Sequence, residues 1–107
     1  MSTSKVSSIL FNLEMTYGES YIEGNAIGLN SIYKINIQGG SLGIKLPKEL
    51  CLSEYVTLYF YTKNGKEIKL YCKAEIGYDW IEIYDDFLTT ILFDDLPTSM
   101  SIEYQHS

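Results

Sequence analysis

The chain has 107 residues, of which 46% are hydrophobic and 21% are charged, proportions typical of a globular protein and unlike those of a disordered one. This length favours a single domain, residues 1–107, around one core. The sequence holds no run of the ~18 apolar residues that a membrane-spanning helix needs, and its N-terminus has no signal-peptide pattern. These features predict a soluble protein of the cytoplasm, or of the host cytoplasm if a virus encodes it.

The net charge of −6 is unevenly distributed. Residues 34–73 carry seven Lys and three Glu, whereas residues 74–107 carry eight acidic residues and no Lys. The chain contains no Arg, the side chain best suited to bidentate contacts with bases and phosphates. The absence of Arg counts against specific nucleic-acid recognition, and the acidic C-terminal third favours a basic partner.

Alternating hydrophobic residues predict mainly β structure. The ten Tyr, together with Ile, Val and Thr, favour strands over helices. Residues 20–27 are a weaker candidate, either a short edge strand or a loop, because Glu23-Gly24-Asn25 is a turn signal. The pair Gly39-Gly40 suits a tight hairpin. Period-2 patterns predict strands at residues 9–17, 31–37, 42–46, 80–84 and 99–104.

Two further strands within residues 55–76 flank Asn64-Gly65 and predict a hairpin. A two-residue turn would mix core and solvent residues on both faces of this hairpin. A three-residue loop with Gly65 in the left-handed conformation avoids this mixture, and because a one-residue slip turns every side chain to the other face, it is the preferred register. It pairs Phe60 with Ile68, Leu58 with Leu70 and Val56 with Cys72.

The hydrophobic period changes over residues 85–93. Phe87, Leu88, Ile91 and Leu92 would share one face of a helix, with Asp85-Asp86 at its start as a cap and as partners of the helix dipole. The predicted fold is therefore mainly β, a small antiparallel sandwich or barrel of about six or seven strands with one short helix near residues 85–93.

The hairpin register also predicts a candidate binding surface. The hairpin face opposite the core interleaves tyrosines with lysines, and Tyr is enriched at interfaces because it stacks, packs and hydrogen-bonds. Tyr is equally a favoured strand residue, and this face could be covered by a second layer of the domain or merely solvated, so both interpretations remain open. The predicted partner-binding residues are Tyr55, Tyr59, Tyr61, Lys69, Tyr71 and Lys73, with Asp85, Asp86, Asp94 and Asp95 of the acidic C-terminal third.

The sequence predicts no catalytic residue and no cofactor. His106, the only histidine, lies in a C-terminal tail that is expected to fray. Cys51 has no histidine nearby in the sequence, and Cys51 and Cys72 are expected to be buried free thiols. Residues 39–43 lack the Lys and the following helix of a phosphate-binding loop. We therefore expect the protein not to be an enzyme.

No metal site is predicted either. The pairs Asp85-Asp86 and Asp94-Asp95 could in principle bind Mg²⁺ or Ca²⁺. Adjacent residues at a helix end do not converge on one ion, however, and the sequence has no calcium-binding loop. A helix cap and a solvated acidic face are the preferred interpretation of these residues.

The segment GGSLGIKLPKEL, residues 39–50, resembles the first half of the swapped-hairpin motif of AbrB-like regulators and MazE-like antitoxins. In that family a Gly-x-Ser-Leu segment leads into an alternating strand and an Ile/Leu-Pro-Lys-Glu step. The partial resemblance extends to about residue 70 and implies a homodimer of interlocked hairpins that holds basic side chains against DNA. Lys45 and Lys48 fall at the positions of the family's basic residues. The candidate DNA contacts of this alternative are Lys34, Lys45 and Lys48.

Three functions remain open. Size and charge favour a non-catalytic protein-interaction module, a small acidic inhibitor or antagonist, by analogy with antitoxins, immunity proteins and phage anti-defence proteins such as anti-CRISPRs. The alternative is an AbrB/MazE-like DNA-binding regulator or antitoxin that acts as a homodimer. A structural or assembly subunit is the third.

Overall fold

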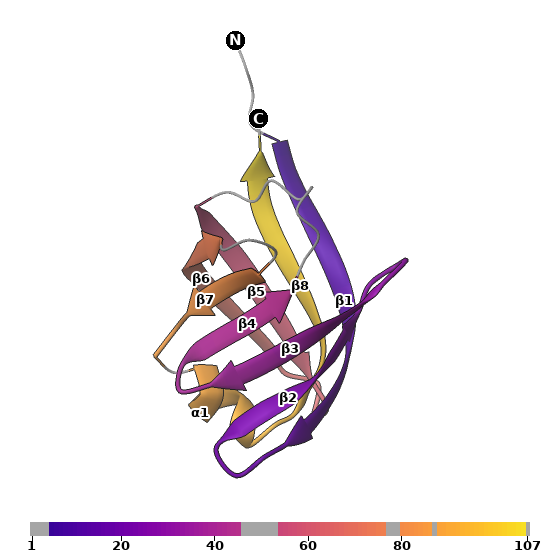
Figure 1. Cartoon of the computed structure of the whole chain (residues 1–107), viewed down its shortest axis with the longest axis vertical. Coiled ribbons are helices and arrows are strands. Elements are labelled where there is room, and N and C mark those ends of the chain that lie inside the picture. The colour runs from indigo at the N-terminus through magenta and orange to yellow at the C-terminus, as the bar shows by residue number, and fades with distance from the viewer. Residues whose placement is uncertain (1–4, 46–53, 77–79, 87, 107) are drawn as a thin grey trace.

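A computed structural model describes residues 5–45, 54–76, 80–86 and 88–106. Within these residues the chain forms antiparallel strands and one short helix (Figure 1), which confirms the prediction of a mainly β fold. The strands number eight, more than the six or seven expected. They are β1 (Lys5–Tyr17), β2 (Tyr21–Ile27), β3 (Ile32–Gln38), β4 (Ser41–Lys45), β5 (Tyr55–Thr62), β6 (Glu67–Ile76), β7 (Trp80–Tyr84) and β8 (Pro97–His106), and the helix is α1 (Leu88–Phe93).

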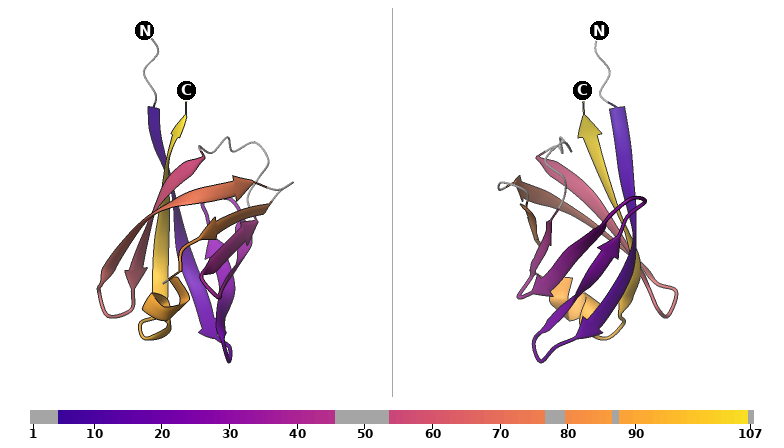
Figure 2. Two further views of the ribbon diagram at one scale, coloured as in Figure 1. Left: turned by 90° about the vertical axis from the view of Figure 1, so that its left-hand side faces the viewer. Right: turned by 45° about the vertical axis from the view of Figure 1, so that its right-hand side comes forward.

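The strands close into a barrel with the order β1-β2-β3-β4-β7-β6-β5-β8, and β8 pairs with β1 to complete it. Two meanders build this barrel, β1 to β4 and β5 to β7. On one side, β7 of the second meander pairs with β4 of the first. On the other side, β8 lies between the two meanders and pairs with both β5 and β1. Figure 2 shows the two meanders from the side, with β8 running the length of the molecule. Of the two predicted architectures, the barrel is the one that forms.

Strand β2 accounts for the difference in strand number, because the turn expected at Glu23-Gly24-Asn25 is absent from it. Gly24 is an interior residue of β2 and lies opposite Met15 of β1. A Cβ atom at Gly24 would lie 1.9 Å from the carbonyl oxygen of Glu14. Glycine inside a strand often marks such a close approach of two backbones, so Gly24 lets β1 and β2 come together here and does not end the strand.

The two predicted hairpins are confirmed. Gly39 and Gly40 have positive φ angles of 56° and 80° and form the two-residue connection between β3 and β4, as the mirror-image turns of tight hairpins require. Gly65 has φ of 83°. The β5–β6 register is the predicted one, with Phe60 opposite Ile68, Leu58 opposite Leu70 and Val56 opposite Cys72.

Side chains fill the barrel, as expected for an interior of eight strands. Each strand turns alternate residues inward, and the largest fully buried side chains on the strands include Phe11, Phe60 and Met100. Helix α1 closes one end of the barrel, at the bottom of Figure 1, by burying Leu88 and Leu92. The helix contacts β2, β3 and β4.

The helix begins later than predicted. The sequence predicts a short helix near residues 85–93 with Asp85-Asp86 at its start as a cap, whereas α1 starts at Leu88 and has no acidic residue in its first turn. The backbone N–H of Leu88 donates to the carbonyl oxygen of Asp85 at 3.1 Å, so Asp85 and Asp86 belong to the turn that precedes the helix. At six residues, α1 falls far short of the length needed to cross a membrane, and it is the sole helix of the described ranges.

Candidate partner-binding surface

The six Tyr and Lys residues predicted to bind a partner lie together on the outer face of β5 and β6. Alternation places them there, because Val56, Leu58 and Phe60 point into the barrel. The structure excludes a covering second layer, since none lies over this face among the residues described, and it leaves the face exposed to solvent. Tyr71 is 70% exposed and Tyr55 is 49% exposed. The cross-strand pairs of the face are Tyr55 with Lys73, Thr57 with Tyr71, Tyr59 with Lys69 and Tyr61 with Glu67.

Neighbouring side chains hold the aromatic rings of this face in place. The rings of Tyr55 and Tyr71, which are diagonal neighbours across the two strands, stack with centroids 5.6 Å apart and planes 10° apart. The ammonium group of Lys69 lies 5.7 Å from the centroid of the Tyr59 ring, within the range of a cation–π contact. Rings that are already ordered lose less conformational freedom when a partner packs against them.

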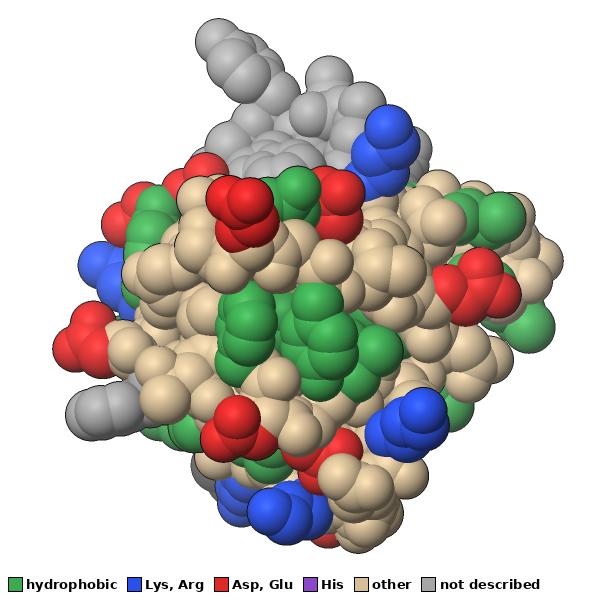
Figure 3. All heavy atoms as spheres, turned by 90° about the horizontal axis from the view of Figure 1, so that it is seen from below, with side chains coloured by type: hydrophobic (Ala, Val, Ile, Leu, Met, Phe, Trp, Pro, Cys, Tyr) green, Lys and Arg blue, Asp and Glu red, His purple; other side chains and the backbone are tan. Residues whose placement is uncertain are grey.

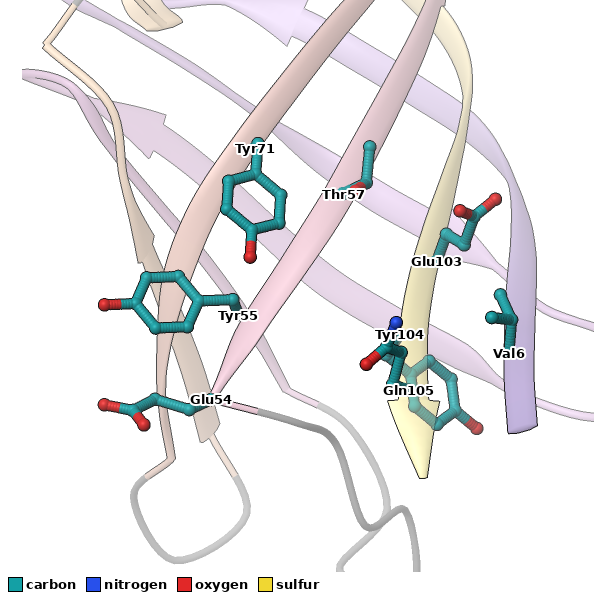
Figure 4. Close-up of a pocket in the computed structure, with 8 residues that line it drawn as sticks. All are labelled: Val6, Glu54, Tyr55, Thr57, Tyr71, Glu103, Tyr104 and Gln105. Carbon is teal, nitrogen blue, oxygen red and sulfur yellow. The ribbon is translucent and has the colours of Figure 1, made fainter. Parts of the chain in front are cut away.

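A groove of about 320 Å³ adjoins the stacked tyrosines. Figure 4 shows Tyr55 and Tyr71 on one side of it, Thr57 in the middle, and Glu103 and Val6 on the other side. The groove thus combines side chains of β1, β5, β6 and β8. Its lining consists of Val6, Glu54, Tyr55, Thr57, Tyr71, Glu103, Tyr104 and Gln105.

The charged groups that line the groove are the carboxylates of Glu54 and Glu103. Lys73 lies at its margin, with Nζ 3.5 Å from Oε1 of Glu54, and both side chains are more than half exposed. Solvent screens such an exposed ion pair, which therefore contributes little to stability. Aromatic faces beside carboxylates favour a cationic group over an anionic one.

Sequence reasoning did not assign Glu103, Gln105 or Val6 to this surface. The alternation of Met100, Ile102 and Tyr104 does place Glu103 and Gln105 on the outer face of the last strand. The missing information was which strands lie beside it: β8 pairs with β5, setting Glu103 opposite Thr57, and with β1, setting Gln105 opposite Val6.

The four predicted aspartates lie at the other end of β5, near the end of the barrel that α1 closes. Asp86 and Asp94 are exposed and Asp85 is half-buried. Figure 3, a view of this end, shows a hydrophobic patch with acidic side chains around it. The ring of Tyr17, the last residue of β1, contacts the ring of Phe93, the last residue of α1, with centroids 5.4 Å apart.

Asp95 corrects the prediction of a solvated acidic face, because it is only 5% exposed. Its Oδ2 accepts a hydrogen bond from the hydroxyl of Thr62 at 2.5 Å, and its Oδ1 accepts one from the backbone N–H of Asn64 at 3.1 Å. The Thr62 hydroxyl also accepts from the backbone N–H of Lys66 at 3.0 Å. Asp95 therefore ties the β5–β6 loop to the segment that follows α1, and it is not available to a partner.

The residues of the DNA-binding alternative are only partly placed. Lys34 is exposed on the outer face of β3. Lys45 is the last residue of β4, which pairs with β3 and β7 of its own chain, but its side chain and the whole of Lys48 lie outside the described residues.

Of the histidine and the two cysteines, the structure describes His106 and Cys72. His106 ends β8 opposite Lys5, so the expectation of a frayed tail at this residue is wrong. Cys72 is a buried free thiol, as predicted. Burial, with a smaller contribution from the charge of Asp85, raises the pKa of the Cys72 thiol to about 11, which keeps it protonated and unreactive at neutral pH. Cys51 lies outside the described residues.

Comparison with known proteins found no family that matches this sequence, no curated relative and no matching solved structure. The function of the protein must therefore be inferred from its own fold and surface. It is an eight-stranded antiparallel barrel with a filled interior, one end closed by a short helix, and a groove lined by tyrosines on its outer wall.

Proposed function

We propose that this protein is a non-catalytic binding module, a small acidic inhibitor or antagonist, that engages a basic macromolecular partner through the tyrosine-lined groove. The observation that supports this proposal most directly is the groove itself, where the stacked rings of Tyr55 and Tyr71 lie on one side of Thr57 and the side chain of Glu103 lies on the other. The six sequence-predicted residues form the adjoining face. Antitoxins, immunity proteins and anti-defence proteins such as anti-CRISPRs remain analogies of size and charge.

The groove suits a lysine or arginine side chain of a protein partner. The aliphatic part of such a side chain would pack on the tyrosine rings, and its charged end would be attracted by the ring faces and by Glu103. The groove is open, and its walls are ordered by strand pairing on both sides. A partner could therefore dock with little rearrangement of the backbone.

The acidic end of the barrel has a different role in this proposal. Asp86 and Asp94 are exposed but lie at the other end of the barrel from the groove, so they act through the field of the molecule and not through the same contact. A net charge of −6 raises the rate at which a basic partner meets the protein, and this effect weakens with rising salt.

An affinity pull-down from the native host, with nuclease added, tests the proposal. The double substitution Tyr59→Ala and Tyr71→Ala is expected to abolish recovery of the partner. The matched control is Tyr84→Ala, because Tyr84 is as exposed as Tyr55 but lies on β7, and its hydroxyl donates to Glu82 of the same strand. Recovery that survives the double substitution, or that is lost equally in the control, would exclude the groove face as the binding surface.

The DNA-binding alternative gives an opposite result in a salt titration. For binding through lysines, the logarithm of the binding constant falls linearly with the logarithm of the salt concentration, with a slope set by the number of phosphates contacted. Substitution of Lys34 and Lys45 would then reduce affinity for DNA, whereas the proposed module shows no DNA binding even at about 50 mM salt, where such contacts are strongest.

A further inference from the structure

The N-terminal half of β1 has an open edge. Residues 5–11 pair with β8 on one side. On the other side β2 pairs with β1 only from Asn12 onward, and no other strand of the described ranges takes its place. In Figure 1 this half of β1 runs beside β8 above the barrel wall, while the turn between β2 and β3 points away to the right.

Most of this open edge lacks the usual protection against strand pairing. Natural edge strands are commonly blunted by charges, prolines or bulges; Lys5 stands at one end of the edge, but residues 6–11 read VSSILF, with no charge and no proline. The outward-facing residues are Val6, Ser8 and Leu10, and both hydrophobic ones are more than half exposed, at 60% and 64%.

A hydrophobic notch lies beside the same edge. The depression, of about 530 Å³, is lined by Ser8, Ile9, Leu10, Asn12, Gly28 and Leu29, none of which is charged. Leu29, in the turn between β2 and β3, is 97% exposed and forms the far wall of the notch. A strand added to the edge of β1 would lie in this notch and cover Leu10 and Leu29.

We propose that the strand that fills this notch is β1 of a second copy of the protein, paired antiparallel across a two-fold axis at Ser8. In this register the two open edges, residues 5–11 of each copy, match in length. Val6 of each copy lies opposite Leu10 of the other, so both exposed hydrophobic residues gain a cross-strand partner. The same surface patch of both copies is used, as a two-fold interface requires.

The carboxylates nearest to the edge on the outer face do not oppose this pairing. The nearest carboxylate on the outer face is Glu103, which lies opposite Ser8 on β8. In the dimer the two Glu103 residues would be separated by three strand spacings, about 14 Å. This exceeds the Debye length of about 8 Å at physiological salt, so their repulsion is largely screened. The uncharged notch offers nothing to the basic partner proposed for the groove, which is why a second copy is the better occupant.

Two single substitutions test the register. Val6→Lys and Leu10→Glu each place a charge opposite a hydrophobic residue of the other copy, so each variant alone is expected to be monomeric. Mixed in equal amounts, they should form a dimer with one copy of each, because the new lysine and the new glutamate then face each other and the remaining Leu10 faces Val6. The matched control is Tyr84→Lys, an exposed position on β7, which should stay dimeric.

Sedimentation velocity from micromolar to millimolar protein and native mass spectrometry give the readout, with no partner present, so the outcome is independent of the proposed groove function. Thermal unfolding of each variant confirms that it folds. The expected result is a wild-type dimer, two monomeric single variants and a heterodimer on mixing. A monomeric wild type, dimeric single variants, or a mixture that stays monomeric would each overturn the proposal.

Discussion

Substitution of Asp95 by alanine tests whether the buried carboxylate holds the β5–β6 loop to the rest of the barrel. The substitution removes both acceptor oxygens, Oδ2 at 2.5 Å from the hydroxyl of Thr62 and Oδ1 at 3.1 Å from the backbone nitrogen of Asn64. The Thr62 hydroxyl is buried and would lose its acceptor. Asn64 is exposed, so its N–H can turn to water instead.

The magnitude follows from this difference between the two bonds. A hydrogen bond to a charged group contributes roughly 1.5–3 kcal/mol to stability, and we take the upper part of this range for Thr62 and less than the lower limit for Asn64. The expected loss in the free energy of unfolding is roughly 2–4 kcal/mol. At about 4 °C per kcal/mol for a domain of this size, the midpoint of thermal unfolding should fall by roughly 8–16 °C.

Urea unfolding followed by circular dichroism measures this loss, and Asp94→Ala is the matched control. Asp94 is the preceding residue and is exposed, so its removal should change stability by no more than about 0.5 kcal/mol. Asp95→Asn should fall between the two, because its amide keeps one acceptor oxygen but loses the charge. If Asp95→Ala and Asp94→Ala proved equally stable, the hydrogen bonds of Asp95 would not be what anchors the loop.

Three further predictions concern the groove, the barrel wall and the buried thiol. Glu103→Gln should weaken binding of a basic protein partner about tenfold, the loss of one charge-assisted contact, measured by calorimetry; tighter binding would instead indicate a nucleic acid. Gly24→Ala should destabilise the protein by at least about 2 kcal/mol in the same urea assay, whereas Gly28→Ala, whose new Cβ would meet its nearest atom at 3.5 Å, should be nearly neutral. Because the pKa of Cys72 is raised from its ordinary 9.0 to about 11 in the folded state, the unfolded chain loses this proton first. The stability that Cys72 contributes below pH 9 should therefore be lost as pH rises from about 9 to about 11. The free energy of unfolding is measured against pH for the Cys51→Ser protein with and without Cys72→Ala, and parallel curves for these two proteins would contradict the prediction.

The elements of this fold could be predicted from the sequence because each strand has one face inside the barrel and one outside. The alternation of Val56, Leu58 and Phe60 against tyrosines revealed both the strand and its inner face. It also determined the register of the β5–β6 hairpin, since a one-residue slip would have turned Phe60 to solvent. The tyrosine face followed from that register alone.

The remaining features depend on contacts between residues far apart in the sequence. The groove needs β1, β5, β6 and β8 side by side, and periodicity does not say which strands become neighbours. The sequence predicts Asp95 at the surface, because a carboxylate is buried only where other groups hydrogen-bond to it or neutralise its charge, and no such group is near Asp95 in the sequence. Its partners, Thr62 and Asn64, come from a hairpin more than thirty residues earlier. The turn signal at Gly24 was wrong because a close approach of two strands also calls for glycine.

The seam between β1 and β8 has a consequence for how the protein folds. It pairs Lys5 with His106 and Asn12 with Ser99, so the complete seam cannot form until residue 106 has left the ribosome. Contacts of such long sequence separation slow folding. Until β8 arrives, the VSSILF segment has no neighbour on either side, and unpaired strand edges of this kind promote aggregation of incomplete chains. A chain cut before Pro97 should therefore precipitate, and supply of residues 97–106 as a separate peptide should rescue it.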